Sequence, residues 1–253
     1  MSTDSHTARP PSRFAAIVGY TLRSCVPPRR WAAIVLASTG AVLFGLLAHA
    51  VDDTADRAFA NVAAEGILSL AMPIAALVIG DSVLGAEMRS GTFHFTWLTP
   101  APTWQIVVGR WLGGALVALV TITPACGLAA VVAGSPSSVG PMLLAAVVGS
   151  VSYIALFVAV GSITRRTAVW SLAIVFLIER LLGAALTGIA QLSPTWESRA
   201  IFVGLLDDAP RRLVRKGIPD GAGAIVRLAI VTLVALAIAN WRMKHLKLSG
   251  ASD

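Results

Sequence analysis

The chain has little of what a soluble enzyme is built from. Only 13% of its 253 residues are charged, and it contains just four histidines. No histidine lies deep within a long apolar run, and the zinc-peptidase pattern His-Glu-x-x-His is absent. Neither an intramembrane serine–histidine protease nor a metal-dependent hydrolase is therefore indicated. We expect no catalytic residues, no metal and no cofactor in this chain.

A phosphate-binding loop is also missing. The pattern Gly-x-x-x-x-Gly-Lys-Ser/Thr, whose backbone amides cradle nucleotide phosphates, does not occur. The sequence also has no helix-turn-helix or aromatic RNA-binding motif, so the net charge of +7 does not indicate binding to nucleic acid. Any use of ATP by this protein would require a partner that binds ATP and Mg²⁺.

The sequence is instead rich in long apolar runs, and hydrophobic residues make up 56% of it. A helix rises about 1.5 Å per residue, so roughly 20 apolar residues cross a hydrocarbon core of about 30 Å. The runs are too long and continuous for barrel strands. The pattern predicts an all-α polytopic membrane protein with one transmembrane domain over residues 13–253, after a disordered tail over residues 1–12. Six spans are expected, at about 31–50, 62–83, 112–133, 141–162, 168–190 and 224–241.

The basic residues predict that both termini are cytosolic. With that orientation the inner segments hold twelve of the 20 lysines and arginines: Arg9, Arg13, Arg23, Arg29, Arg30, Arg89, Arg110, Arg165, Arg166, Arg242, Lys244 and Lys247. The last outer loop departs from this rule with Arg199, Arg211, Arg212, Arg215 and Lys216. It is long and comes late in the chain, where earlier spans have usually fixed the orientation. On this topology neither Cys25 nor Cys126 faces an oxidising compartment, so no disulfide is expected.

An amphipathic helix is expected to precede the first span. From Arg13 onward, apolar residues recur at helical spacing, and Pro27-Pro28 ends the pattern. Two interpretations remain open and are compatible. The helix either lies in the headgroup layer with its arginines toward anionic lipid, or it packs on the inner surface of the bundle.

The segment from Glu87 to Arg110 joins the second and third spans at the predicted cytosolic side. Gly91 is suited to the left-handed conformation that ends a helix, and Thr92 to capping a short helix that Pro100 stops. Thr103 is expected to cap the third span. The short helix would present aromatic side chains, and its central residues are Phe93, His94, Phe95, Trp97 and Leu98. From the residues alone, docking of another protein and anchoring in the membrane interface are equally supported.

This segment resembles the signature of the ATP-binding-cassette (ABC) type-2 permeases, and the closing Trp241-Arg242 with its basic residues resembles their actinobacterial members. The likeness rests on Glu87, Gly91-Thr92-Phe93, Pro100 and the closing Gly109-Arg110. Six spans, cytosolic termini and an amphipathic N-terminal helix are similar too. The chain differs from the family pattern where Trp104 replaces a common arginine, and where Phe93, Phe95 and Trp97 replace smaller aliphatic residues.

The resemblance implies a function and partners. Such permeases form homodimers or heterodimers in the bacterial plasma membrane, and each docks a separate nucleotide-binding ATPase subunit through this loop, the coupling helix. The residues implied in coupling are Glu87, Arg89, Gly91, Thr92, Phe93, His94, Phe95, Trp97, Leu98 and Pro100. The expected function is efflux of a drug, peptide or lipid-like substrate. A proton-coupled secondary transporter and a non-transporting immunity or sensing subunit are the alternatives.

Two adjacent charges, Glu179 and Arg180, fall near the middle of the fifth span, where charge is costly. Neighbouring residues on a helix point about 100° apart, so we expect them to reach different helices. Arg227 and Glu65 are the candidate partners, in a structural ion pair or in a gate. After Pro194 the sequence predicts a short helix, which either rests in the outer headgroups or, as the family likeness suggests, caps the outer end.

Overall fold

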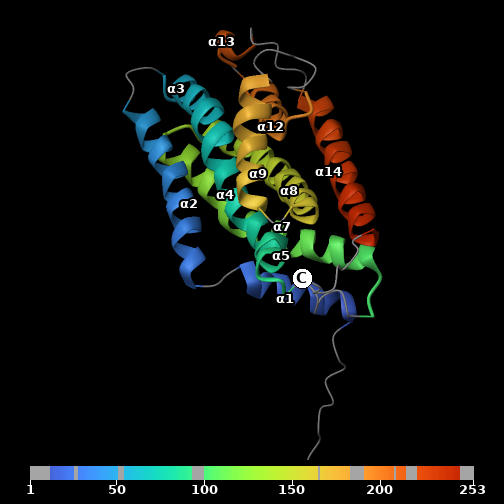
Figure 1. Cartoon of the computed structure of the whole chain (residues 1–253). Coiled ribbons are helices and arrows are strands. Elements are labelled where there is room, and N and C mark those ends of the chain that lie inside the picture. The colour runs from blue at the N-terminus through green and yellow to red at the C-terminus, as the bar shows by residue number, and fades with distance from the viewer. Residues whose placement is uncertain are drawn as a thin grey trace, which may run out of the picture.

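The structure of the chain is a computed structural model that describes residues 12–25, 28–50, 54–92, 100–164, 166–182, 191–207, 209–214 and 221–245. Within these ranges every regular element is a helix. The long helices run side by side, and α1 (Arg13–Cys25) lies across one end of them (Figure 1). We call this the α1 end. The opposite end carries the start of α3 (Ala55–Val62) and α13 (Arg211–Val214), and we call it the α13 end.

Four of the predicted spans fall on helices that are long and apolar enough to cross a membrane. These helices cover Ala55–Ser90, Thr103–Val132, Pro136–Ile163 and Gly221–Lys244. The first predicted span falls on α2 (Pro28–His49), and the fifth on α9 (Thr167–Ala173) continued by η4 (Ile174–Leu182). Residues 183–190 of the fifth span lie outside the described residues. The helical, polytopic character thus agrees with the sequence, while the count of six and the cytosolic termini stay predictions.

The longest of these helices is built from five consecutive pieces. They are α3, η1 (Ala63–Ala71), α4 (Met72–Gly80), η2 (Asp81–Gly85) and α5 (Ala86–Ser90), and η1 and η2 are π-helical. Proline lacks the amide that a helix needs and its ring crowds the carbonyl four residues back. The wider π-turns of η1 come directly before Pro73, and the Ser69 hydroxyl donates to the Ala64 carbonyl at 2.6 Å. The helix therefore passes Pro73 without a break.

The centre of the bundle is α8 (Val139–Ile163), which packs against α7 (Thr103–Val132), α4 and α14 (Gly221–Lys244). Small side chains form much of the buried surface, as is typical of helices that approach closely in a membrane. Fully buried examples are Ala118, Ala129, Ala145, Ala146, Ala155 and Ala239. A 3-10 turn, η3 (Pro136–Ser138), joins α7 to α8.

Helix α12 (Pro194–Gly204) lies inside the bundle rather than on its surface. It packs against α8, α14 and η1, and most of its residues are buried. Phe202 contacts Phe59 near the α13 end, whereas Thr195, at the start of α12, contacts Tyr153 far along α8. The helix thus rises from the interior of the bundle toward the α13 end. This placement corrects the interpretation in which it rests in the outer headgroups.

Candidate functional site

Glu87 and Arg110 form a buried, two-pronged ion pair between α5 and α7. Arg110 Nη1 lies 2.7 Å from Glu87 Oε1, and Nη2 lies 2.8 Å from Oε2. Nη1 also donates to the Val83 carbonyl at 3.2 Å, and the Arg110 side chain is only 2% exposed. Paired N–H donors fix the orientation of a carboxylate as well as its position. The pair therefore fixes the two helices to each other at either end of segment 91–102.

Helix α1 covers this ion pair. The Tyr20 ring lies over the Arg110 guanidinium in a cation–π contact, and its ring centre is 4.7 Å from Arg110 Cζ. Burial and the neighbouring Glu87 carboxylate raise the pKa of the Tyr20 phenol, although Arg110 opposes the shift. The phenol therefore stays uncharged beside Glu87 at neutral pH.

Two glycines of α7 explain how α1 comes so close. A Cβ on Gly113 would lie 2.6 Å from the Thr21 Cβ, and one on Gly109 would lie 2.9 Å from Ile17 Cγ2. Thr21 is fully buried, and its hydroxyl donates to the Ile17 carbonyl at 2.9 Å. Of the two interpretations of the N-terminal helix, the structure shows the packed one. Arg13 and Arg23 of this helix remain exposed, which is compatible with contact to headgroups.

The C-terminal end of segment 91–102 is also held by hydrogen bonds. Arg13 Nη1 on α1 donates to the Pro100 carbonyl at 3.0 Å. The Thr103 hydroxyl donates to Asn240 Oδ1 on α14 at 3.0 Å. The expectation that Thr103 caps α7 is wrong, because Pro102 occupies the cap position and Thr103 is the first helical residue.

The N-terminal end of segment 91–102 begins at Gly91, whose φ of 73° ends α5 as the sequence predicted. Next to it the hydroxyls of Ser90 and Thr92 are 2.8 Å apart. The side chain of Arg89 is 40% exposed and pairs with Asp81 through two contacts of 2.5 and 2.7 Å. The five central residues of the proposed coupling helix, Phe93, His94, Phe95, Trp97 and Leu98, lie outside the described residues, so their role stays a prediction.

Arg227 and Glu65, the residues expected to partner Glu179 and Arg180, both contact charged residues of α12. Arg227 on α14 holds Glu197 of α12 through contacts of 2.7 and 3.1 Å, and Glu197 is fully buried. Glu65 on η1 pairs with Arg199 of α12 at 3.0 Å. Glu65 and Arg227 lie toward the α13 end. The buried helix α12 places an opposite charge beside each of them there, Arg199 beside Glu65 and Glu197 beside Arg227.

Glu179 itself binds hydroxyl groups. Its Oε2 accepts a hydrogen bond from Tyr153 on α8 at 2.5 Å and one from Thr195 on α12 at 2.6 Å. The adjacent Arg180 side chain lies outside what the structure describes. In place of an ion pair between Glu179 and Arg227 the structure shows a cluster of oxygens, whereas the pairing of Arg180 stays a prediction.

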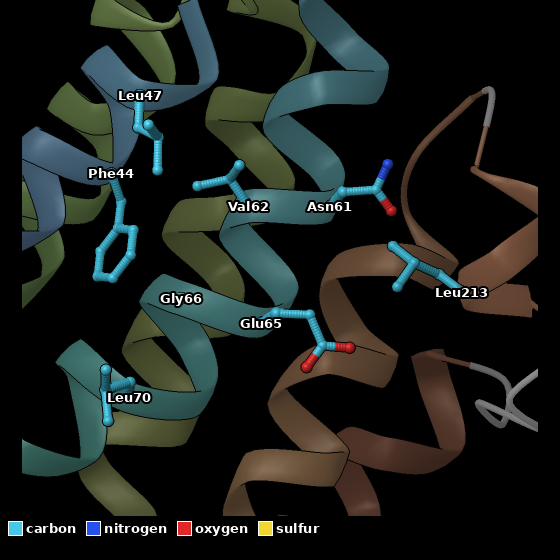
Figure 2. Close-up of a pocket in the computed structure, with 8 residues that line it drawn as sticks. All are labelled: Phe44, Leu47, Asn61, Val62, Glu65, Gly66, Leu70 and Leu213. Atoms are coloured by element: carbon cyan, nitrogen blue, oxygen red, sulfur yellow. The ribbon is translucent and has the colours of Figure 1, made fainter. Parts of the chain in front are cut away.

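A groove of about 400 Å³ opens between α2 and the α3–η1 region toward the α13 end. Figure 2 shows Asn61 and Glu65 on the side facing Leu213, and Phe44 and Leu47 on the opposite wall. The Phe44 ring lies against Gly66, where a Cβ would come within 2.7 Å of Cδ1. The groove is mainly apolar with two polar residues at one side, and its volume suits a small ligand.

Several residues around these sites were not identified from the sequence. They are Tyr20, Asp81, Tyr153, Thr195 and Glu197. A carboxylate within an apolar run is a signal that would have singled out Asp81. The others carry no local signal, because their partners lie on helices far away in the sequence.

These features define a multi-pass helical membrane protein in which a buried ion pair, covered by α1, joins the two helices that flank segment 91–102. The family model for the ABC-2 family transporter proteins matches residues 12–202, and the chain belongs to this family. It is thus a transport membrane subunit of the plasma membrane. A comparison with curated proteins finds no match.

Proposed function

We propose that this chain is the permease subunit of an ATP-driven exporter, and that segment 91–102 docks a separate ATPase subunit. The observation that carries the proposal is the Glu87–Arg110 ion pair, which fixes the two helices that flank the segment. A loop can transmit a conformational change of the ATPase to the bundle only if the two helices that flank it move together. The buried pair, together with Arg13 on Pro100, supplies that stiffness.

Because the sequence contains no phosphate-binding loop, transport driven by ATP needs a partner subunit that binds the nucleotide and docks on segment 91–102. ATP and Mg²⁺ would be bound by the partner, whose movements reach the bundle through α5 and α7. A second permease copy, identical or related, would complete the transport path. Family membership supports the ATPase partner, because ABC-2 permeases normally work with an ABC ATPase subunit.

The substrate class is a drug, peptide or lipid-like molecule. The groove lined by Phe44, Leu47, Val62 and Leu70 favours an apolar or amphipathic cargo. Glu65 and Asn61 at its side offer polar contacts for such a cargo. Replacing Gly66 with valine would displace the Phe44 ring, and we expect it to change which cargo is exported while ATPase binding is kept.

The test of coupling is a variant with Phe93, Phe95 and Trp97 all changed to alanine. We expect it to insert in the membrane, to lose co-purification with a Walker-motif ATPase, and to lose both transport and stimulated ATPase activity. Normal transport by this variant would overturn the proposal. Transport that needs no ATPase at all would instead favour a proton-coupled carrier, and binding of the ATPase without any transport would favour an immunity or sensing subunit.

A further inference from the structure

Three side-chain oxygens meet in the interior of the bundle, each from a different helix. They are the Tyr153 hydroxyl of α8, Glu179 Oε2 of η4 and the Thr195 hydroxyl of α12. Both hydroxyls lie within 2.6 Å of Oε2, and they are also in direct hydrogen-bond contact with each other. Every oxygen of the cluster therefore touches the other two.

The number of protons in this cluster can be counted. Three oxygen–oxygen contacts need three protons if each is to be a hydrogen bond, and the two hydroxyls supply one each. With an ionised Glu179, both hydroxyls donate to the carboxylate and no proton remains for the contact between Tyr153 and Thr195. A proton on Glu179 Oε2 supplies the third hydrogen bond. Each oxygen then donates once and accepts once in a closed ring.

The surroundings of Glu179 also favour the neutral acid. Glu179 lies twelve residues beyond Thr167, the start of α9. At about 1.5 Å per residue it is roughly 18 Å along the span, near the middle of a 30 Å hydrocarbon core. An isolated carboxylate at such a depth is strongly disfavoured. Oxygens dominate its described neighbours, including Ser193, while Arg199 and Arg227 of the same region bind Glu65 and Glu197.

We propose that Glu179 is a proton-binding site within the membrane, and that its protonated carboxyl closes a three-membered hydrogen-bond ring that fastens the start of α12 to α8 and η4. When the Oε2–H bond breaks, the proton passes to water and the bonding pair stays on the carboxylate. The direct contact between Tyr153 and Thr195 then has no proton, so the start of α12 is joined to α8 only through the Glu179 carboxylate and is held less firmly. This inference does not depend on the proposed docking of an ATPase.

The test is infrared spectroscopy of the full-length protein in lipid nanodiscs at neutral pH. A protonated carboxyl has its own C=O stretching band, separate from the bands of carboxylates. We expect the wild-type minus Glu179→Gln difference spectrum to contain the protonated band and no carboxylate bands. A difference spectrum with carboxylate bands alone would overturn the proposal.

Glu65→Gln is the matched control, because Glu65 pairs with Arg199 and is therefore expected to be ionised. Its difference spectrum should contain carboxylate bands only. Tyr153→Phe removes one hydroxyl of the ring, and we expect it to shift the protonated band and to speed hydrogen–deuterium exchange in α12 at the same pH. If Glu179→Gln fails to insert, this variant decides the matter: an unshifted band with unchanged exchange in α12 would contradict the ring.

Discussion

Glu87 and Arg110 are 23 residues apart, yet their side chains meet in two contacts of 2.7 and 2.8 Å that are almost sealed from solvent. The pair brackets segment 91–102, on which the proposed coupling depends. Tyr20 over Arg110, and Arg13 on Pro100, add the N-terminal helix to the same unit. We therefore expect a substitution in this unit to change both the stability of the α1 end and the transmission of movement through segment 91–102.

Replacing Glu87 with alanine should destabilise the protein strongly, because it leaves the buried Arg110 cation without its carboxylate. Breaking a buried pair in this way typically costs about 3–5 kcal/mol. Asp81→Asn is the matched control, since it disrupts an ion pair whose Arg89 side chain is 40% exposed, and we expect a loss of at most about 1 kcal/mol. Thermal unfolding in nanodiscs measures both changes, and equal losses would contradict the assigned burial.

The Tyr20 ring lies over Arg110, and its phenol also interacts with Glu87 and Arg110. Tyr20→Phe keeps the ring contact and should therefore lose less stability than Tyr20→Ala, which should lose about 0.5–2 kcal/mol. The same thermal unfolding measurement separates them. If Tyr20→Phe were as damaging as Tyr20→Ala, the hydroxyl would be the essential group and the cation–π contact would be excluded as the main interaction.

Docking of α1 on α7 can be followed through Cys25, which is 1% exposed. Gly113→Leu places a side chain where Thr21 now lies, so we expect α1 to be displaced and Cys25 to become reactive toward a maleimide reagent. Cys126, buried inside the bundle, should stay unlabelled and serves as the internal reference. Gly19→Ala is the control variant, because a Cβ there meets nothing within 4 Å. Unchanged labelling of Cys25 in Gly113→Leu would contradict the packing of α1.

The two ion pairs of α12 differ in burial, so removing their carboxylates should reduce the stability of the protein by different amounts. Glu197 is fully buried, whereas the Glu65 side chain is 48% exposed. We therefore expect Glu197→Gln to lower the unfolding temperature clearly more than Glu65→Gln, because solvent screens the second pair. A larger effect for Glu65→Gln would show that α12 is held mainly at the groove.

Much of the fold could be predicted from the sequence, because apolar runs of membrane length and the Gly91 helix end are local signals. The partners of buried polar groups could not. Glu179 meets Thr195 only because α12 starts deep in the bundle, and hydropathy carries no information on that depth. Likewise, Glu87 and Arg110 both belong to the family signature in the sequence, but nothing local indicated that they bind each other.

The central claim, that segment 91–102 docks an ATPase subunit, is tested most directly by site-directed cross-linking. Thr92 and Pro100 are exposed at its two ends, whereas Ser137 is exposed beside Asp56 at the start of α3, to which its hydroxyl donates at 2.9 Å. Single variants Thr92→Cys, Pro100→Cys and Ser137→Cys would be treated with a cysteine-to-lysine cross-linker in membranes that contain the ATPase, against a background in which Cys25 and Cys126 are buried. We predict cross-links to the ATPase from positions 92 and 100 and none from position 137. Cross-linking from position 137 alone, or from none of the three, would contradict the account.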